Sequence, residues 1–157
     1  FDFDAHHGNG IQTAFEEEAD TTYISIHEHP SFSYPGTGWA EDRGFGAGKG
    51  TILNLPLPPG SGEEQVVRLL PRIRKFLEEA RPDALIVGAG FDAHREDDMS
   101  GLNFSVDVYR RLGSFVTELG RDLTGGRVVS ILEGGYNLDQ LGICAEAYLS
   151  GLVENNP

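Results

Sequence analysis

The sequence predicts an α/β fold in which helices cover both faces of a parallel sheet. Segments with strand-like and helix-like patterns alternate along the chain, which is typical of parallel strands joined by helical crossovers. The run 84–88 (Ala-Leu-Ile-Val-Gly) is almost entirely apolar and predicts a strand covered on both faces. The segment 62–80 repeats apolar residues at three- and four-residue spacing, as an amphipathic helix does.

Each element can be placed in chain order from its local pattern. Residues 1–6 alternate aromatic or small residues with polar ones, as a strand does, and the Gly-Asn-Gly turn at 8–10 ends them. The long segment 27–50 shows no periodicity and is expected to be a functional loop. Ser105 is the expected cap of the third helix, and Asn137 or Asp139 opens the last one. The predicted strands are 1–6, 21–26, 52–55, 84–88 and 127–132, and the predicted helices are 10–17, 62–80, 105–123 and one that follows 137–139.

Length, charge and cysteine content narrow the class of protein. A chain of 157 residues suits one domain that can bury a core. The 25 acidic and 12 basic residues give a formal charge of −13, which argues against a nucleic-acid-binding surface. Cys144 is the only cysteine, and the sequence shows neither a signal peptide nor an apolar run of about 18 residues. We therefore expect a cytoplasmic protein whose partners are neither membranes nor nucleic acids.

The opening stretch carries the strongest chemical signal. In an extended strand Asp2, Asp4 and His6 lie on one face, and Phe1 and Phe3 lie on the other. Carboxylates beside a packed strand are costly to bury unless a cation compensates their charge. The pattern predicts a divalent metal held by Asp4 and His6. The plainer interpretation is a polar strand whose acids face water.

Two further polar clusters follow apolar strands, one at Asp92 and one at Glu133. In open α/β sheets the ligand site lies beyond the carboxyl ends of the strands, where these clusters could converge. Asp4, His6 and Asp92 would supply one nitrogen and two carboxylates. Three protein ligands are typical of catalytic zinc, although the same set also suits iron, cobalt or manganese. Without the Asp4-x-His6 pair, Asp92 would be interpreted as a turn or cap residue.

These motifs resemble those of one family. Asp-x-Asp-x-His-His-Gly-Asn-Gly at 2–10, Gly-Phe-Asp-Ala-His at 90–94 and Glu-Gly-Gly-Tyr-Asn at 133–137 are similar to motifs of the histone deacetylase superfamily, which includes acetylpolyamine amidohydrolases. The stretch 44–57 resembles the bacterial members of that superfamily. The resemblance covers essentially the whole chain. It implies an arginase/deacetylase-like α/β fold and zinc-dependent hydrolysis of an N-acetyl amide.

The resemblance also implies roles for the residues of the site. Tyr136 would polarise the substrate carbonyl, and the Gly134-Gly135 turn would let its phenol approach the substrate closely. From the residues alone, the plainer interpretation of Tyr136 is an aromatic side chain that caps the core. The zinc ligands implied by the resemblance are Asp4, His6 and Asp92.

Four more residues receive roles only through the resemblance. Asp2 and Ser25 would hold a structural monovalent cation, potassium, and Tyr34 and Met99 would line the tunnel for the acylated substrate. Asp2 could equally be a solvated acid, and Tyr34 and Met99 could be ordinary packing residues. His7, which points away from His6, is expected to be a hydrogen-bonded core histidine rather than a ligand.

The chain departs from the family in one respect. The family's tandem histidine pair, which serves as general base and acid, has no counterpart, because the adjacent His6 and His7 already belong to the metal motif. We therefore expect residues 1–157 to be the C-terminal part of a single deacetylase catalytic domain and to be inactive alone.

Three functions follow from these patterns. The first is a zinc deacetylase acting on an acetyl-lysine protein or an acetylated small molecule such as an acetylpolyamine, and an oligomer is compatible with the sequence. The second is an arginase-type manganese ureohydrolase, which Gly8 and His94 disfavour because they stand where that class needs aspartate. The third is a non-catalytic remnant or binding module.

Overall fold

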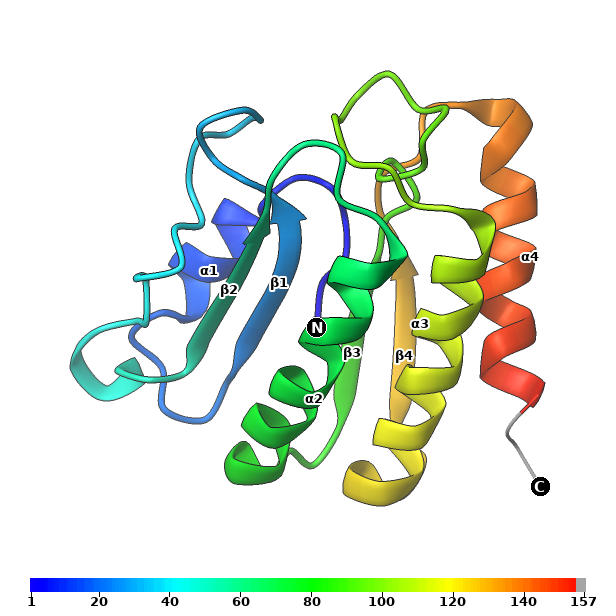
Figure 1. Ribbon diagram of the computed structural model, residues 1–157. Helices are drawn as coiled ribbons and strands as arrows, with labels where there is room; N and C mark the ends of the chain where they lie inside the picture. The colour runs from blue at the N-terminus through cyan, green and yellow to red at the C-terminus, as the bar shows by residue number, and fades with distance from the viewer. Residues whose placement is uncertain (155–157) are drawn as a thin grey trace.

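The structure, a computed structural model, describes residues 1–154 and confirms the predicted parallel α/β class (Figure 1). Helices and strands alternate as expected, and most predicted bounds differ by only a few residues. The predicted strand 1–6 is shorter than expected, because only Asp2 forms strand bridges and the chain bends at residues 5–6. A 3-10 turn covers Gly46–Gly48, and a π-helical turn at Gly120–Thr124 extends the third helix. The main elements are α1 (Asn9–Phe15), β1 (Tyr23–Glu28), β2 (Ile52–Leu57), α2 (Glu63–Ala80), β3 (Leu85–Ala89), α3 (Val106–Leu119), β4 (Val128–Leu132) and α4 (Leu138–Glu154).

The opening residues join two pairs of parallel strands. β1 pairs with β2, and β3 pairs with β4, each in parallel register. Asp2 forms parallel bridges to Ser25 of β1 and to Gly88 of β3. The amide of Asp2 donates to the carbonyl of Ile24 at 2.8 Å, and the amide of Gly88 donates to the carbonyl of Phe1 at 2.9 Å. The first residues therefore form the middle of the sheet, between β1 and β3.

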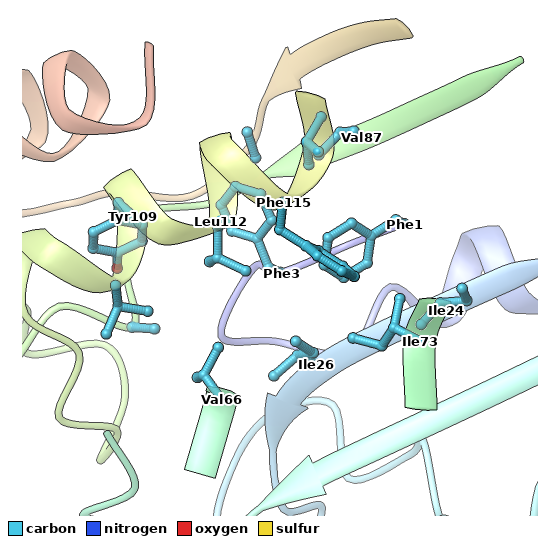
Figure 2. Packing of buried hydrophobic residues seen from close by; sticks show 14 of the residues in the cluster. Phe1, Phe3, Ile24, Ile26, Val66, Ile73, Val87, Tyr109, Leu112 and Phe115 are labelled. Carbon is cyan, nitrogen blue, oxygen red and sulfur yellow. The ribbon is translucent and has the colours of Figure 1, made fainter. Parts of the chain in front are cut away.

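The core forms on the face of the opening segment that carries Phe1, Phe3 and Ala5, all of which are buried. Figure 2 shows Phe1 and Phe3 close to Phe115 of α3, and the rings of Phe1 and Phe115 meet edge to face with centroids 6.3 Å apart. Each large apolar side chain buried in this way stabilises the fold by about 1.5–3 kcal/mol. This packing fixes the opening segment, so the polar residues that alternate with its aromatics have a defined position.

The starts of the last two long helices show which polar residues act as caps. Asn137 Oδ1 accepts hydrogen bonds from the amides of Asp139 and Gln140, so Asn137, rather than Asp139, caps α4. Ser105 occupies the cap position of α3 in an extended conformation, but its side chain makes no capping hydrogen bond. The position of the α3 start was thus predicted correctly, while its expected mechanism was wrong.

One face of the β3–β4 pair is exposed in the part of the chain that the structure describes. Ile86 of β3 is 62% exposed, and Val129 and Ile131 of β4 are also exposed. In Figure 1, α2 and α3 lie in front of the sheet, and α1 lies behind it beside β1 and β2. The expectation that the strand 84–88 is covered on both faces is therefore wrong for Ile86, although Val87 on the opposite face is completely buried.

No helix within residues 1–154 combines the length and the apolar character needed to cross a membrane.

Candidate metal centre and active site

The candidate site lies where several strands of the sheet end. Asp4 and His6 follow the middle strand, Asp92 follows β3, and Tyr136 follows β4. Because neighbouring parallel strands end at the same edge, residues far apart in the sequence meet there. The convergence expected from the three sequence clusters is present.

Asp4, His6 and Asp92 form a group that we call the carboxylate cluster. His6 Nδ1 lies 2.8 Å from Asp92 Oδ2 and 3.2 Å from Asp4 Oδ1. One potential ligand atom from each of the three residues lies within 4.8 Å of the others. Asp92 is completely buried, and the amide of Ala5 donates to its Oδ1 at 2.8 Å. The cluster therefore offers one nitrogen and two oxygens on a rigid frame.

The electrostatics of the carboxylate cluster call for a cation. Hydrogen bonds to Asp4 and Asp92 raise the pKa of His6 to about 10, so the imidazole would be protonated at neutral pH. Burial raises the pKa of Asp92. Burial also opposes the charge of Asp4, but hydrogen bonds from His6 and Gly134 outweigh it and lower the Asp4 pKa. A divalent ion would take over the role of the imidazolium proton, so these donors fit a metal.

The second nitrogen of His6 has its own partner. His6 Nε2 lies 3.2 Å from the backbone carbonyl of Met99. A carbonyl can only accept, so Nε2 donates to Met99. Nδ1 is then the nitrogen that faces Asp4 and Asp92, and it would bind a metal in place of its proton. Metal-binding histidines are commonly oriented in this way, through a hydrogen bond from the nitrogen that does not bind the metal.

The Gly134-Gly135 turn brings the segment after β4 against the carboxylate cluster. The amide of Gly134 donates to Asp4 Oδ2 at 2.7 Å. A Cβ at Gly134 would collide with the carboxylates of Asp4 and Asp92, and Gly135 has a φ of 141°, which favours glycine. Two glycines are therefore required for the backbone to reach this position.

Tyr136 follows the turn with its side chain 57% exposed. Partial burial, together with Asp92, Asp4 and other nearby carboxylates, raises the pKa of its phenol. The hydroxyl therefore keeps its proton at neutral pH and can donate a hydrogen bond.

A cavity of about 510 Å³ brings most of the predicted site residues together. Asp4 and His6 lie in its wall, and Asp92 packs behind them. Tyr34 and Met99, which the resemblance places in a substrate tunnel, line the same cavity and are 79% and 52% exposed. The predicted residues in the wall are Asp2, Asp4, His6, Tyr34, Met99, Gly134 and Tyr136.

His7 belongs to a separate hydrogen-bonded network that we call the amide cluster, formed by the buried His7, Gln12 and Asn54 and the exposed Thr37. The ring nitrogens of His7 lie 2.9 Å from Thr37 Oγ1 and 2.9 Å from Gln12 Oε1, and Asn54 Nδ2 donates to the same oxygen of Gln12. Burial lowers the pKa of His7. Both ring nitrogens are therefore occupied by neutral partners, as expected for a core histidine.

Asp2 and Ser25 lie side by side in the sheet, but their side chains have different partners. Asp2 accepts hydrogen bonds from the hydroxyl of Tyr23 at 2.9 Å and from the amide of Asp4 at 3.0 Å. The Ser25 hydroxyl lies 2.7 Å from His27 Nδ1. Burial raises the pKa of Asp2 to about 7. The monovalent cation at these residues stays a prediction.

Two acidic residues of the site received no role from the sequence, although Glu133 was noted as the start of a motif. Glu133 lines the cavity, and burial raises the pKa of its carboxyl group. Asp97 is buried, and it accepts hydrogen bonds from three backbone amides. The motif Glu-Gly-Gly-Tyr marks Glu133 in the sequence. Asp97 stands in an ordinary acidic run, Glu96-Asp97-Asp98, that gives no such signal.

The fold and the site define a parallel α/β protein with a candidate metal centre at the carboxyl ends of its strands. The chain belongs to the histone deacetylase family, because the family profile described as "Histone deacetylase domain" matches residues 1–152. This match confirms the resemblance drawn from the three motifs.

Named relatives and a solved structure agree with this assignment. The chain is 44% identical over 147 residues to "Histone deacetylase 14, chloroplastic" of Arabidopsis thaliana, covering 89% of this chain and 33% of the relative. It is 36% identical to a "Histone deacetylase-like amidohydrolase" of Pseudomonas aeruginosa, covering 96% and 40%. The crystal structure of an acetylpolyamine aminohydrolase from Burkholderia pseudomallei matches with a TM-score of 0.88 and 36% identity, covering 96% and 43%. The chain thus spans less than half the length of each.

Proposed function

We propose that this chain carries the zinc-binding part of a deacetylase that hydrolyses N-acetyl amides. The observation that carries the proposal is the meeting of three metal-type ligands and a protonated phenol at one cavity. Relatives named as histone deacetylase and acetylpolyamine amidohydrolase support an acetylated substrate, either an acetyl-lysine protein or an acetylated small molecule.

Each residue of the site has a part in this chemistry. Asp4, His6 and Asp92 would hold the zinc, whose contribution when bound is to polarise the carbonyl and to acidify a water molecule. Tyr136 donates a hydrogen bond to the oxygen that becomes negative as the amide is attacked. Gly134 and Gly135 let the backbone approach without a side chain in the way.

The proposed function also covers the substrate approach, a monovalent cation site and the extent of the catalytic domain. Tyr34 and Met99 line the approach of the acyl group, and Asp2 and Ser25 contribute to a potassium site. Residues 1–157 are the C-terminal part of a single catalytic domain, and the tandem histidine pair of the family comes from outside these residues. His7 cannot replace that pair while both of its ring nitrogens are hydrogen-bonded. The proposed compartment is the cytoplasm.

The proposal is tested with the full-length protein and two reporters, an acetyl-lysine peptide and an acetylpolyamine. We expect release of acetate from at least one, loss of the activity on chelation, and its return with zinc. Absence of hydrolysis in zinc-loaded, folded protein would favour the non-catalytic binding module instead. The ratio of kcat/KM for the two reporters then assigns the substrate class.

A further inference from the structure

We propose that Asp97 is a positioning residue that fixes Tyr136 relative to the metal ligand His6. The inference rests on the proposed function and adds to it a residue that neither binds the metal nor lines the cavity. Asp97 lies in the loop after β3, two residues before Met99. It is a buried carboxylate, 4% exposed, in a loop whose neighbouring acids are exposed.

The two oxygens of Asp97 face different parts of the site. Oδ1 accepts a hydrogen bond from the amide of Met99 at 3.0 Å. Oδ2 accepts one from the amide of Tyr136 at 2.7 Å and another from the amide of Asn137 at 2.9 Å. One carboxylate therefore ties the loop after β3 to the loop after β4.

The Met99 side of this link reaches the metal ligand. The Met99 carbonyl accepts the hydrogen bond from His6 Nε2, and that bond sets which nitrogen of His6 faces the carboxylates. Asp97 therefore holds, through one backbone residue on each side, the group that orients a ligand and the residue that would stabilise the oxyanion. Asp97 does not line the cavity, which makes it a positioning residue rather than a catalytic one.

The hydrogen bonds of Asp97 should matter for the rate of deacetylation for two physical reasons. Charge-assisted hydrogen bonds to a buried carboxylate are about twice as strong as neutral ones, and a misplacement of about 1 Å in an active site can lower the rate by about 100-fold. The Tyr136 side chain is itself 57% exposed, so packing around the ring gives it little restraint. The backbone of Tyr136 is held instead by Asp97.

The test uses Asp97→Asn in the full-length protein, with Asp98→Asn as the matched control. The asparagine is nearly isosteric but replaces one acceptor oxygen with an NH₂ group, which cannot accept from the facing amides. Asp98→Asn removes the same charge from the exposed neighbour. We expect Asp97→Asn to lower kcat by about 10–100-fold with KM and zinc content little changed, and the control to leave kcat unchanged.

A double-mutant cycle separates positioning from a general structural effect. If Asp97 acts through Tyr136, adding Asp97→Asn to Tyr136→Phe should cost almost nothing further in kcat. An equal fold-loss in both backgrounds would overturn the proposal. If Asp97→Asn does not fold, Asp97→Glu displaces the oxygens while keeping the charge and should show the same pattern.

Amide hydrogen exchange keeps the inference separate from the proposed activity. In Asp97→Asn the amides of Tyr136 and Asn137 should exchange faster than in the parent protein, whereas Asp98→Asn should leave them unchanged. If no deacetylation is found, the proposed function fails, but this exchange still decides whether Asp97 braces the loop. Unchanged exchange at both amides would contradict the inference.

Discussion

Two adjacent histidines of this chain lie in opposite environments. His6 contacts the carboxylates of Asp4 and Asp92, and its pKa is raised to about 10 by them. His7, the next residue, contacts a hydroxyl and an amide oxygen, and burial lowers its pKa. The difference shows that two consecutive side chains just after the middle strand can lie in opposite environments, one among carboxylates and the other among neutral partners.

With the proposed function, the contrast between His6 and His7 predicts that the carboxylate cluster binds the metal and that the amide cluster supports the stability of the fold. An imidazole between carboxylates lies where a cation is favoured, whereas an imidazole between neutral partners is already satisfied. Substitutions in the carboxylate cluster should therefore remove the metal, and substitutions in the amide cluster should lower the stability.

The largest expected effect is the loss of metal from His6→Ala in the full-length protein. Removing a residue that only hydrogen-bonds to a metal ligand lowers metal affinity by about 10–100-fold. Removing the ligand itself should therefore lower zinc affinity by more than about 100-fold. Zinc affinity is measured by competition with a chromophoric chelator. His7→Ala provides the comparison, and a folded His7→Ala protein should keep its zinc. An equal loss of zinc affinity in both variants would contradict the assignment of metal binding to His6 alone.

The next largest effect is a loss of catalytic rate without loss of metal, expected from Tyr136→Phe. Tyr136→Phe removes only a hydroxyl, so the zinc content should not change. Loss of one oxyanion donor should lower kcat by about 10²–10³-fold. Steady-state kinetics together with elemental analysis test this result. Unchanged kcat would mean that Tyr136 is the aromatic cap of the plainer interpretation.

On the amide cluster, His7→Ala should affect stability. The substitution leaves a cavity and removes two hydrogen bonds, of which the one to Gln12 is buried, so the free energy of unfolding should fall by about 2–4 kcal/mol. Denaturant unfolding of the metal-free protein measures it, with His29→Ala in the long loop as a milder control. A loss no greater than that of the control would show that the amide cluster does not support the fold.

The smallest effect is a pH dependence from His27, whose ring packs against His7 with centroids 4.8 Å apart. Burial lowers the pKa of His27 from 6.5 to about 4. Between these values the unfolded chain binds more protons, so the contribution of His27 is fully present above pH 6.5 and is lost as the pH falls.

This contribution should amount to about 1 kcal/mol between pH 7 and pH 5.5. It is measured as the difference in the free energy of unfolding between the parent protein and His27→Gln at both pH values, without metal. Taking the difference between the two proteins removes the contributions of other titrating groups. Asp2 is one of them, and its raised pKa makes stability change with pH in the opposite direction. Parallel pH profiles would show that His27 is not held neutral.

The sequence predicted those parts of the molecule that depend on local patterns. Alternation along 1–6 and apolar periodicity along 62–80 identified the middle strand and α2. The metal-type cluster was also predictable, because Asp4 and His6 are two residues apart directly after the middle strand. Asp92 joined them through its position after β3.

The remaining features depend on contacts between distant segments. Nothing in the run 84–88 distinguishes the exposed side chain of Ile86 from the buried one of Val87, because exposure depends on what packs on each face. Asp97 could not be singled out, since its burial and its three amide partners arise only when the loops after β3 and β4 meet. The choice of Asn137 over Asp139 as the α4 cap likewise depended on backbone geometry.

The most direct test of the account is the metal content of the full-length protein, because the central claim is one zinc ion held by Asp4, His6 and Asp92. Elemental analysis after purification should give one zinc per chain, and Asp92→Ala should lose it. Two manganese ions per chain would contradict the account in favour of the arginase type. Full zinc occupancy in Asp92→Ala would show that the ligands are wrong.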